Sequence, residues 1–187
     1  MEGIRFAHLR TAANPEPRLV VVDEDSAAFV DALFPDAPRT LEELILGGDD
    51  LLARVRDAAA SPAVPRFGFA ETEFASAVLA PPVILAVGLN YAAHSGELGL
   101  KTDQTPTVFV LWPNSLTGHE QTTSWPRSLS ESVDYEAELG VIIGRPAKNV
   151  PQEKALDHVW CYTVVNDVTA RDIQFSEAQW SRCKSFD

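Results

Sequence analysis

Acidic residues are concentrated in the segment Asp134-Tyr135-Glu136-Ala137-Glu138, directly ahead of an apolar run. On an extended strand, residues two apart share a face, so Glu136 and Glu138 would point the same way, about 7 Å apart. Two such carboxylates repel one another unless a cation lies between them, and hard divalent cations prefer oxygen ligands of this kind. The segment is therefore a candidate metal site. The alternative is a solvated strand edge on which the acidic side chains are simply exposed.

A second polar cluster, Asn166 and Asp167 followed by Arg171, comes directly after another apolar run. A strand that ends in Asn-Asp delivers a carboxylate to the end of a sheet, where sites are commonly built. Arg171 is a fixed cation that could bind a substrate carboxylate through two parallel hydrogen bonds. The alternative is structural: Asn166 and Asp167 cap a turn, and Arg171 pairs with Asp172 or Glu177 on the surface.

A third candidate is the pair His94 and Glu97, which would face one another if this stretch is helical. A carboxylate beside an imidazole orients the ring and raises its basicity, as a general base acting on water requires. The alternative for this pair is a surface salt bridge. Lys184, near the end of the chain, could likewise be only a solvated charge.

Composition excludes several classes of function. The 187 residues carry 15 basic and 27 acidic side chains, a net charge of −12, and 45% are hydrophobic. The negative charge argues against nucleic acid and anionic membranes as partners, and no apolar run approaches the roughly 18 residues that span a bilayer. Two cysteines are too few for a disulfide framework, and zinc, P-loop, dinucleotide and nucleophile-elbow motifs are absent from the sequence. We therefore expect a soluble, acidic, cytoplasmic globular protein.

The pattern of elements changes near residue 80. Before it, short strands at Arg5–Leu9 and Leu19–Val22 precede a helix capped by Thr40 and a second helix at Asp49–Ala59. Nothing in this part carries chemistry. We therefore predict a small α/β domain over residues 1–78 that buttresses a functional domain over residues 79–187.

Residues 79–187 contain short apolar strands separated by irregular loops. The predicted strands are Val83–Val87, Thr107–Leu111, Ala137–Ile143 and Trp160–Val165, with short helical segments at Pro151–Asp157 and Gln174–Trp180. Strands without long helices between them favour a mixed, β-rich core over a doubly wound sheet. The unusual polar residues all fall at strand ends or in loops of this core.

In this order, the motifs resemble the fumarylacetoacetate hydrolase family over residues 87–187. The matching segments are Gly88-Leu89-Asn90-Tyr91-x-x-His94-x-x-Glu97, Phe109-x-x-x-Pro113-x-Ser115-Leu116-Thr117-Gly118, Val133-Asp134-Tyr135-Glu136-x-Glu138-Leu139, Ile143-Gly144-Arg145, Asn166-Asp167-Val168-x-x-Arg171-Asp172-x-Gln174 and Lys184-Ser185-Phe186-Asp187. The resemblance implies an α+β fold, a mixed β-sandwich roll, usually dimeric. Family members continue past Lys-Ser-Phe-Asp, so we expect the roll to be incomplete at the C-terminus of this chain.

The resemblance also implies a role for each candidate residue. One divalent cation, Mg²⁺ or else Mn²⁺ or Ca²⁺, would be held by three carboxylates: Glu136, Glu138 and Asp167. Three residues would be catalytic. His94 and Glu97 would activate a water molecule, and Lys184 would lie against the enolate oxygen of the substrate. The remaining residues would contact the substrate, a small 2-oxo acid: Arg171, Gln174 and Tyr91.

The resemblance leaves the reaction open. Hydrolysis of a C–C bond in a 2-oxo or β-diketo acid, of the acylpyruvate or fumarylpyruvate type, is the leading interpretation. Isomerisation or decarboxylation of the 2-oxo dioates of aromatic catabolism would use the same enolate-stabilising site. The third interpretation is a catalytically silent fragment or a binding module. Leu111 stands where members commonly have lysine. The absence of that cation would weaken binding of a second substrate carboxylate.

Overall fold

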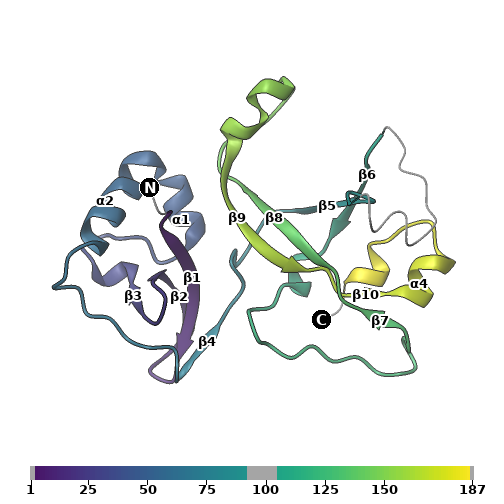
Figure 1. The fold of residues 1–187 in the computed structure, drawn as a ribbon, viewed down its shortest axis with the longest axis horizontal. Helices are drawn as coiled ribbons and strands as arrows, with labels where there is room; N and C mark the ends of the chain where they lie inside the picture. The colour runs from purple at the N-terminus through teal and green to yellow at the C-terminus, as the bar shows by residue number, and fades with distance from the viewer. Residues whose placement is uncertain (1–2, 92–104, 186–187) are drawn as a thin grey trace. The chain divides into compact units, whose positions relative to one another are not determined.

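The computed structural model describes residues 3–91 and 105–185 (Figure 1). The predicted catalytic pair His94 and Glu97 lies outside these residues. The chain packs as two compact units, each built from several stretches of sequence. The first unit contains residues 1–79, 117–121 and 139–164, and the second contains residues 80–116, 122–138 and 165–187. The predicted domain boundary at residue 79 stays a prediction.

The first unit is built on a four-stranded antiparallel sheet in the order β3-β2-β1-β4. Its strands are β1 (Arg5–Thr11), β2 (Asn14–Val22), β3 (Ala27–Phe29) and β4 (Thr72–Phe74). Both faces of β2 are covered, because its consecutive residues Leu19, Val20 and Val21 are all buried. The two faces contribute to separate apolar clusters, one of which packs against helices.

Between β3 and β4 the chain forms the short 3₁₀ helix η1 (Val30–Ala32) and then two α-helices, α1 (Leu41–Leu46) and α2 (Gly48–Ala59). The predicted cap is present, since the Thr40 hydroxyl accepts a hydrogen bond from the Glu43 backbone N–H at 3.1 Å. Fully buried His8 ties β1 to α1. Its Nε2 accepts from the Leu41 backbone N–H at 3.1 Å, so Nδ1 carries the proton that it donates to the Ser76 carbonyl, also at 3.1 Å.

A two-stranded ladder joins β8 (Ala137–Ile143) and β9 (Val159–Asn166), which are connected through η3 (Gln152–His158). Exposure alternates along β8, as a strand with one buried face requires. Ile142 and Trp160 pack against the apolar cluster of the first unit, and Gly144 lies so close to Trp160 that an added Cβ would be 2.7 Å from its side chain. Larger residues at position 144 would therefore separate this ladder.

The second unit contains two further ladders and short helices. One antiparallel ladder pairs β5 (Ile84–Gly88) with β6 (Thr107–Leu111), and the other pairs β7 (Val133–Asp134) with β10 (Thr169–Ala170). The helices are η2 (Pro113–Ser115), α4 (Arg171–Ser176) and η4 (Arg182–Lys184). A small core of Ala170, Ile173 and Cys183, with Trp180 against it, joins β10 to both C-terminal helices.

The strands predicted from apolar runs are present, with bounds within a few residues of those expected. The helical segment predicted at Gln174–Trp180 was misplaced, since the helix runs from Arg171 to Ser176. Its start is fixed by the Arg171 backbone N–H, which donates to the Ser132 carbonyl at 2.8 Å at the end of the β7–β10 ladder. Strands β7 and β10 are two residues long, too short for any periodic pattern. Within residues 3–91 and 105–185, no helix has the length and apolar character that crossing a bilayer requires.

Candidate metal centre

The site is assembled where the segment between β7 and β8 meets the segment after β9. The Asp167 backbone N–H donates to the Glu136 carbonyl at 2.9 Å, and the Asn166 side-chain oxygen accepts from the Glu136 backbone N–H at 3.1 Å. These two bonds continue the strand pairing past the ends of the regular ladder. They hold the acidic residues of the two segments side by side.

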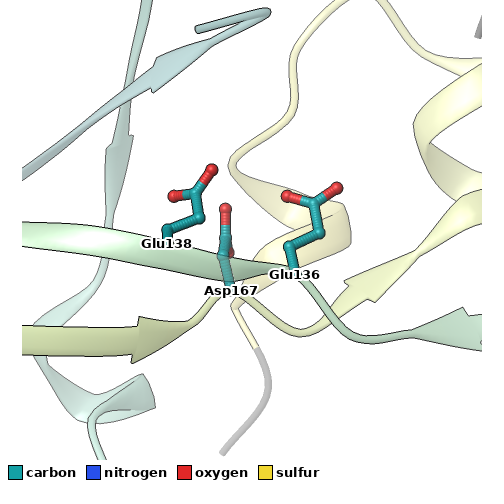
Figure 2. Close-up of side chains that lie close together, drawn as sticks. All are labelled: Glu136, Glu138 and Asp167. Atoms are coloured by element: carbon teal, nitrogen blue, oxygen red, sulfur yellow. The ribbon is translucent and has the colours of Figure 1, made fainter. Parts of the chain in front are cut away.

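Glu136, Glu138 and Asp167 converge. One carboxylate oxygen from each can be chosen so that all three lie within 4.8 Å of one another. Figure 2 shows the three side chains directed toward the same side of the backbone. Asp167 is buried, whereas Glu136 and Glu138 are partly buried. The shared face expected for Glu136 and Glu138 from strand alternation is therefore present, and Asp167 joins them from the neighbouring segment.

The ammonium group of Lys184 lies among these carboxylates. Its Nζ donates to Glu136 Oε2 at 2.8 Å, to Asp167 Oδ2 at 2.7 Å and to the Thr169 hydroxyl at 2.7 Å. These three bonds use all three N–H groups of the ammonium. The side chain of Lys184 is only 3% exposed, so its charge is compensated inside the protein rather than by water. Sequence reasoning missed Thr169, whose hydroxyl also donates to the Asp167 carbonyl at 2.9 Å.

Arg171 holds the other side of Glu136. Its Nη1 donates to Glu136 Oε1 at 2.5 Å and to Gln174 Oε1 at 2.9 Å, while Nε and Nη2 both donate to Asp134 Oδ2, at 3.1 and 2.9 Å. Each oxygen of Glu136 therefore accepts a hydrogen bond from a different cation. Arg171 and Gln174, both predicted to contact substrate, are joined here to the acidic cluster.

The two carboxyl groups that share Lys184 have pKa values shifted in opposite directions. Burial is the largest influence on Asp167 and raises its pKa, and the nearby Lys184 reduces that effect without cancelling it. Burial also acts to raise the pKa of Glu136, but hydrogen bonds and charge from Lys184 and Arg171 together lower it below its ordinary value. Glu136 is thus the better stabilised anion, because two cations face it.

Charge and ligand type both fit a divalent cation. Four carboxylates (Asp134, Glu136, Glu138 and Asp167) and two cations (Arg171 and Lys184) leave a net charge of −2 in their ionised forms. All three converging ligands are hard oxygen donors, which suit Mg²⁺, Mn²⁺ or Ca²⁺ rather than a soft metal. The residues present therefore fit one such ion, with Glu136, Glu138 and Asp167 as its ligands.

A cavity beside the carboxylates has an apolar wall. Phe109 is buried and packs edge-on against Trp180, with ring centroids 5.6 Å apart. Trp180 in turn covers Gly88, where an added Cβ would lie 2.3 Å from the indole. The cavity is lined by the three converging carboxylates Glu136, Glu138 and Asp167 and by ten further residues: Ala86, Val87, Gly88, Leu89, Asn90, Tyr91, Phe109, Gln174, Trp180 and Lys184.

The structure therefore brings together seven of the nine predicted site residues: Tyr91, Glu136, Glu138, Asp167, Arg171, Gln174 and Lys184. Sequence reasoning did not assign roles to Thr169, Phe109 or Trp180. A signal existed for Phe109, which belongs to a quoted motif, whereas Trp180 lies between two motifs, and the packing of the two rings joins segments far apart in the chain.

Comparison with known proteins gives a consistent result. The family model described as "Fumarylacetoacetate (FAA) hydrolase C-terminal" matches residues 83–187. A mitochondrial oxaloacetate tautomerase from Xenopus laevis is 30% identical over 99% of this chain and 59% of its own length. A structure of fumarylacetoacetate hydrolase from Exiguobacterium antarcticum superposes on 99% of this chain and 63% of its own, with a TM-score of 0.78 and 27% identity.

A second solved structure bears on the metal. Maleylpyruvate hydrolase from Sphingobium, in complex with manganese(II) ion and pyruvate, has a TM-score of 0.75 and 25% identity over 98% of this chain and 62% of its own. These structures confirm the predicted mixed fold of strands and few helices. The chain spans about half the length of the curated relatives it matches.

Proposed function

The chain belongs to the fumarylacetoacetate hydrolase family, and we propose that Glu136, Glu138 and Asp167 bind a divalent cation with which the protein stabilises the enolate of a 2-oxo acid. The observation that carries this proposal is the convergence of three carboxylates within 4.8 Å in a cluster whose net charge is −2. Support comes from the manganese and pyruvate held by the maleylpyruvate hydrolase relative.

A bound divalent cation would supply a Lewis acid that lowers the energy of negative charge developing on a substrate oxygen. The chain's own residues prepare that site. Lys184 and Arg171 hold Glu136 by its two oxygens, and Lys184 also holds Asp167, so these two of the three proposed ligands are oriented in advance. Phe109 and Trp180 form an apolar wall that keeps water from one side of the cavity and so strengthens electrostatic interactions inside it.

The reaction that we propose is hydrolysis of a C–C bond in an acylpyruvate or fumarylpyruvate type of substrate. Cleavage next to a carbonyl leaves an enolate, which is the charge this site is suited to stabilise. The water would be activated by the predicted pair His94 and Glu97. The maleylpyruvate hydrolase relative, which is named for a reaction of this class, supports the proposal.

Keto–enol tautomerisation is the second candidate, and a specific observation favours it. The similarity to the Xenopus tautomerase extends over 99% of this chain and 59% of the tautomerase. Tautomerisation needs enolate stabilisation and a proton transfer but no attacking water. A divalent cation held by Glu136, Glu138 and Asp167 would meet the first of these requirements without His94 and Glu97.

Calorimetric titration of Mn²⁺ and Mg²⁺, with and without oxalate as an enolate mimic, tests the proposal. We expect binding that tightens when oxalate is present and is abolished in a Glu136→Gln/Glu138→Gln variant. Glu131→Gln is the matched control, because Glu131 is an exposed carboxylate close in sequence that lies outside the cluster. Absence of metal binding by the unaltered chain would contradict the proposal.

The two candidate reactions are separated by assay of the metal-loaded protein. Acylpyruvates and fumarylpyruvate are followed by release of pyruvate, and the enol form of oxaloacetate is followed by loss of its ultraviolet absorbance. Pyruvate release supports hydrolysis. Accelerated decay of the enol without pyruvate release supports tautomerisation.

A further inference from the structure

We infer that Asp134 is a positioning residue of the metal centre, which fixes the guanidinium of Arg171 and through it the ligand Glu136. Asp134 does not belong to the converging ligand triad. The inference rests on the proposed function and adds to it the residue that orients one of the ligands. It depends on a chain of contacts running from β7 into the site, all within the second unit.

Asp134 is itself held at both oxygens. Its backbone pairs with Thr169 in the β7–β10 ladder, and its Oδ1 accepts from the Tyr135 backbone N–H at 2.9 Å. This bond turns Oδ2 toward Arg171, where it receives both Nε–H and Nη2–H. The carboxylate is 47% exposed, so it can be altered without opening a buried cavity.

Arg171 transmits this orientation because its guanidinium is planar and rigid. When Nε and Nη2 are fixed on Asp134, the direction of Nη1 is fixed as well, and Nη1 is the atom that contacts Glu136. The Arg171 side chain is 14% exposed and its backbone is anchored by the bond to Ser132. Few alternative positions are therefore open to it.

The contact matters for metal binding because Arg171 holds Oε1 of the Glu136 carboxylate, whereas Lys184 holds Oε2. A ligand that is oriented before the ion arrives loses less conformational freedom on binding. Asp134 also shares the positive charge of Arg171 with Glu136, so without Asp134 that charge would be balanced by the ligand Glu136 alone among these two carboxylates and would oppose the incoming cation more strongly. Both effects predict weaker metal binding when Asp134 is lost.

The test measures the Kd of Mn²⁺ by calorimetry in single variants of the full chain. Asp134→Asn, which keeps the shape of the side chain but removes its charge, should raise the Kd by about tenfold to a hundredfold, as for other residues that support metal ligands. Glu131→Gln removes the same charge from an exposed residue three positions earlier and should change the Kd far less. Asp134→Glu, which retains a carboxylate, should recover most of the affinity.

Arg171→Lys separates positioning from simple electrostatics. The substitution keeps the positive charge but replaces the fork by a group that cannot hold Asp134 and Glu136 in one plane. Positioning therefore predicts a weaker site, whereas a purely electrostatic role predicts no change. In the double variant Asp134→Asn/Arg171→Lys the loss should be no greater than that of the more severe single variant, because both act through one contact.

The metal-free melting temperature of each variant is measured alongside, since a purely structural defect would lower it in proportion to the lost affinity. The inference is overturned if Asp134→Asn binds Mn²⁺ as tightly as the unaltered chain, if Glu131→Gln has the same effect, or if the two single losses add. The proposed function fails in a different way, by the unaltered chain binding no Mn²⁺ at all.

Discussion

The buried ammonium group of Lys184 compensates two carboxylates of the site, Glu136 and Asp167. Methionine at this position keeps much of the side-chain volume but removes the charge and all three donors. The lost bonds, of 2.7 to 2.8 Å, join Lys184 to two carboxylates and one hydroxyl. Removal of one partner from a buried ion pair costs about 3–5 kcal/mol, because it leaves the other charge uncompensated. We expect Lys184→Met to lower the free energy of unfolding by that amount.

The effect should also depend on pH in a defined direction. Lys184 is among the causes that lower the pKa of Glu136, and this contribution to stability is present above the ordinary pKa of a glutamate and is lost as the pH falls through the lowered value. In the variant, Glu136 and Asp167 can relieve their repulsion by taking up a proton. The stability deficit of Lys184→Met should therefore be greatest near neutral pH and should narrow on acidification.

Urea denaturation in the presence of a chelator, followed by circular dichroism, measures both effects. Lys154→Met is the matched control: this lysine is 65% exposed, its nearest carboxylate is 3.9 Å away, and such surface pairs contribute about 0–1 kcal/mol. A Lys184→Met variant as stable as the control, or a deficit that stays constant with pH, would refute the argument that buried charge compensation holds this site together.

Three further predictions concern other parts of the chain. Burial lowers the pKa of His8, so the free energy of unfolding should fall as the pH drops below about 6.5, where the unfolded state gains a proton. The variant His8→Gln should flatten the plot of unfolding free energy against pH. The control His119→Gln, at an exposed histidine, should leave that plot unchanged. Gly88→Ala should force Trp180 to move and cost about 1–3 kcal/mol, seen as a changed tryptophan emission and a lower urea midpoint. Leu111→Lys should shift turnover from alkyl 2-oxo acids toward those with a second carboxylate, and an unchanged preference would contradict the role assigned to this position.

Sequence patterns within a few residues predicted the longer strands and the start of one helix, because these features depend on neighbouring residues. Apolar runs with few breaks identified β5, β6, β8 and β9, and the Thr40 cap identified the start of α1. Strands β7 and β10 were missed because two residues carry no periodicity, and the register between them is set by long-range pairing. These missed strands are the ones that place Asp134 and Thr169 beside the site.

In the candidate site, too, the locally determined features could be predicted and the long-range contacts could not. Strand alternation is a local property, so the shared face of Glu136 and Glu138 could be predicted from their spacing alone. The contacts that compensate the charge of Glu136 could not be predicted in this way, because the two cations come from elements much later in the chain: Arg171 at the start of α4 and Lys184 in η4.

The compensating cations also decide how the metal site is to be understood. A cluster of four carboxylates without Arg171 and Lys184 would repel itself, and folding would have to wait for metal. With both cations in place, Glu136 has a donor on each oxygen and Asp167 is bonded to Lys184, so two of the three proposed ligands are held before any ion arrives. The residual charge of −2 is then what a single divalent cation neutralises. The same two side chains therefore compensate the acidic cluster without metal and, in the proposed site, leave the charge that one divalent cation would balance.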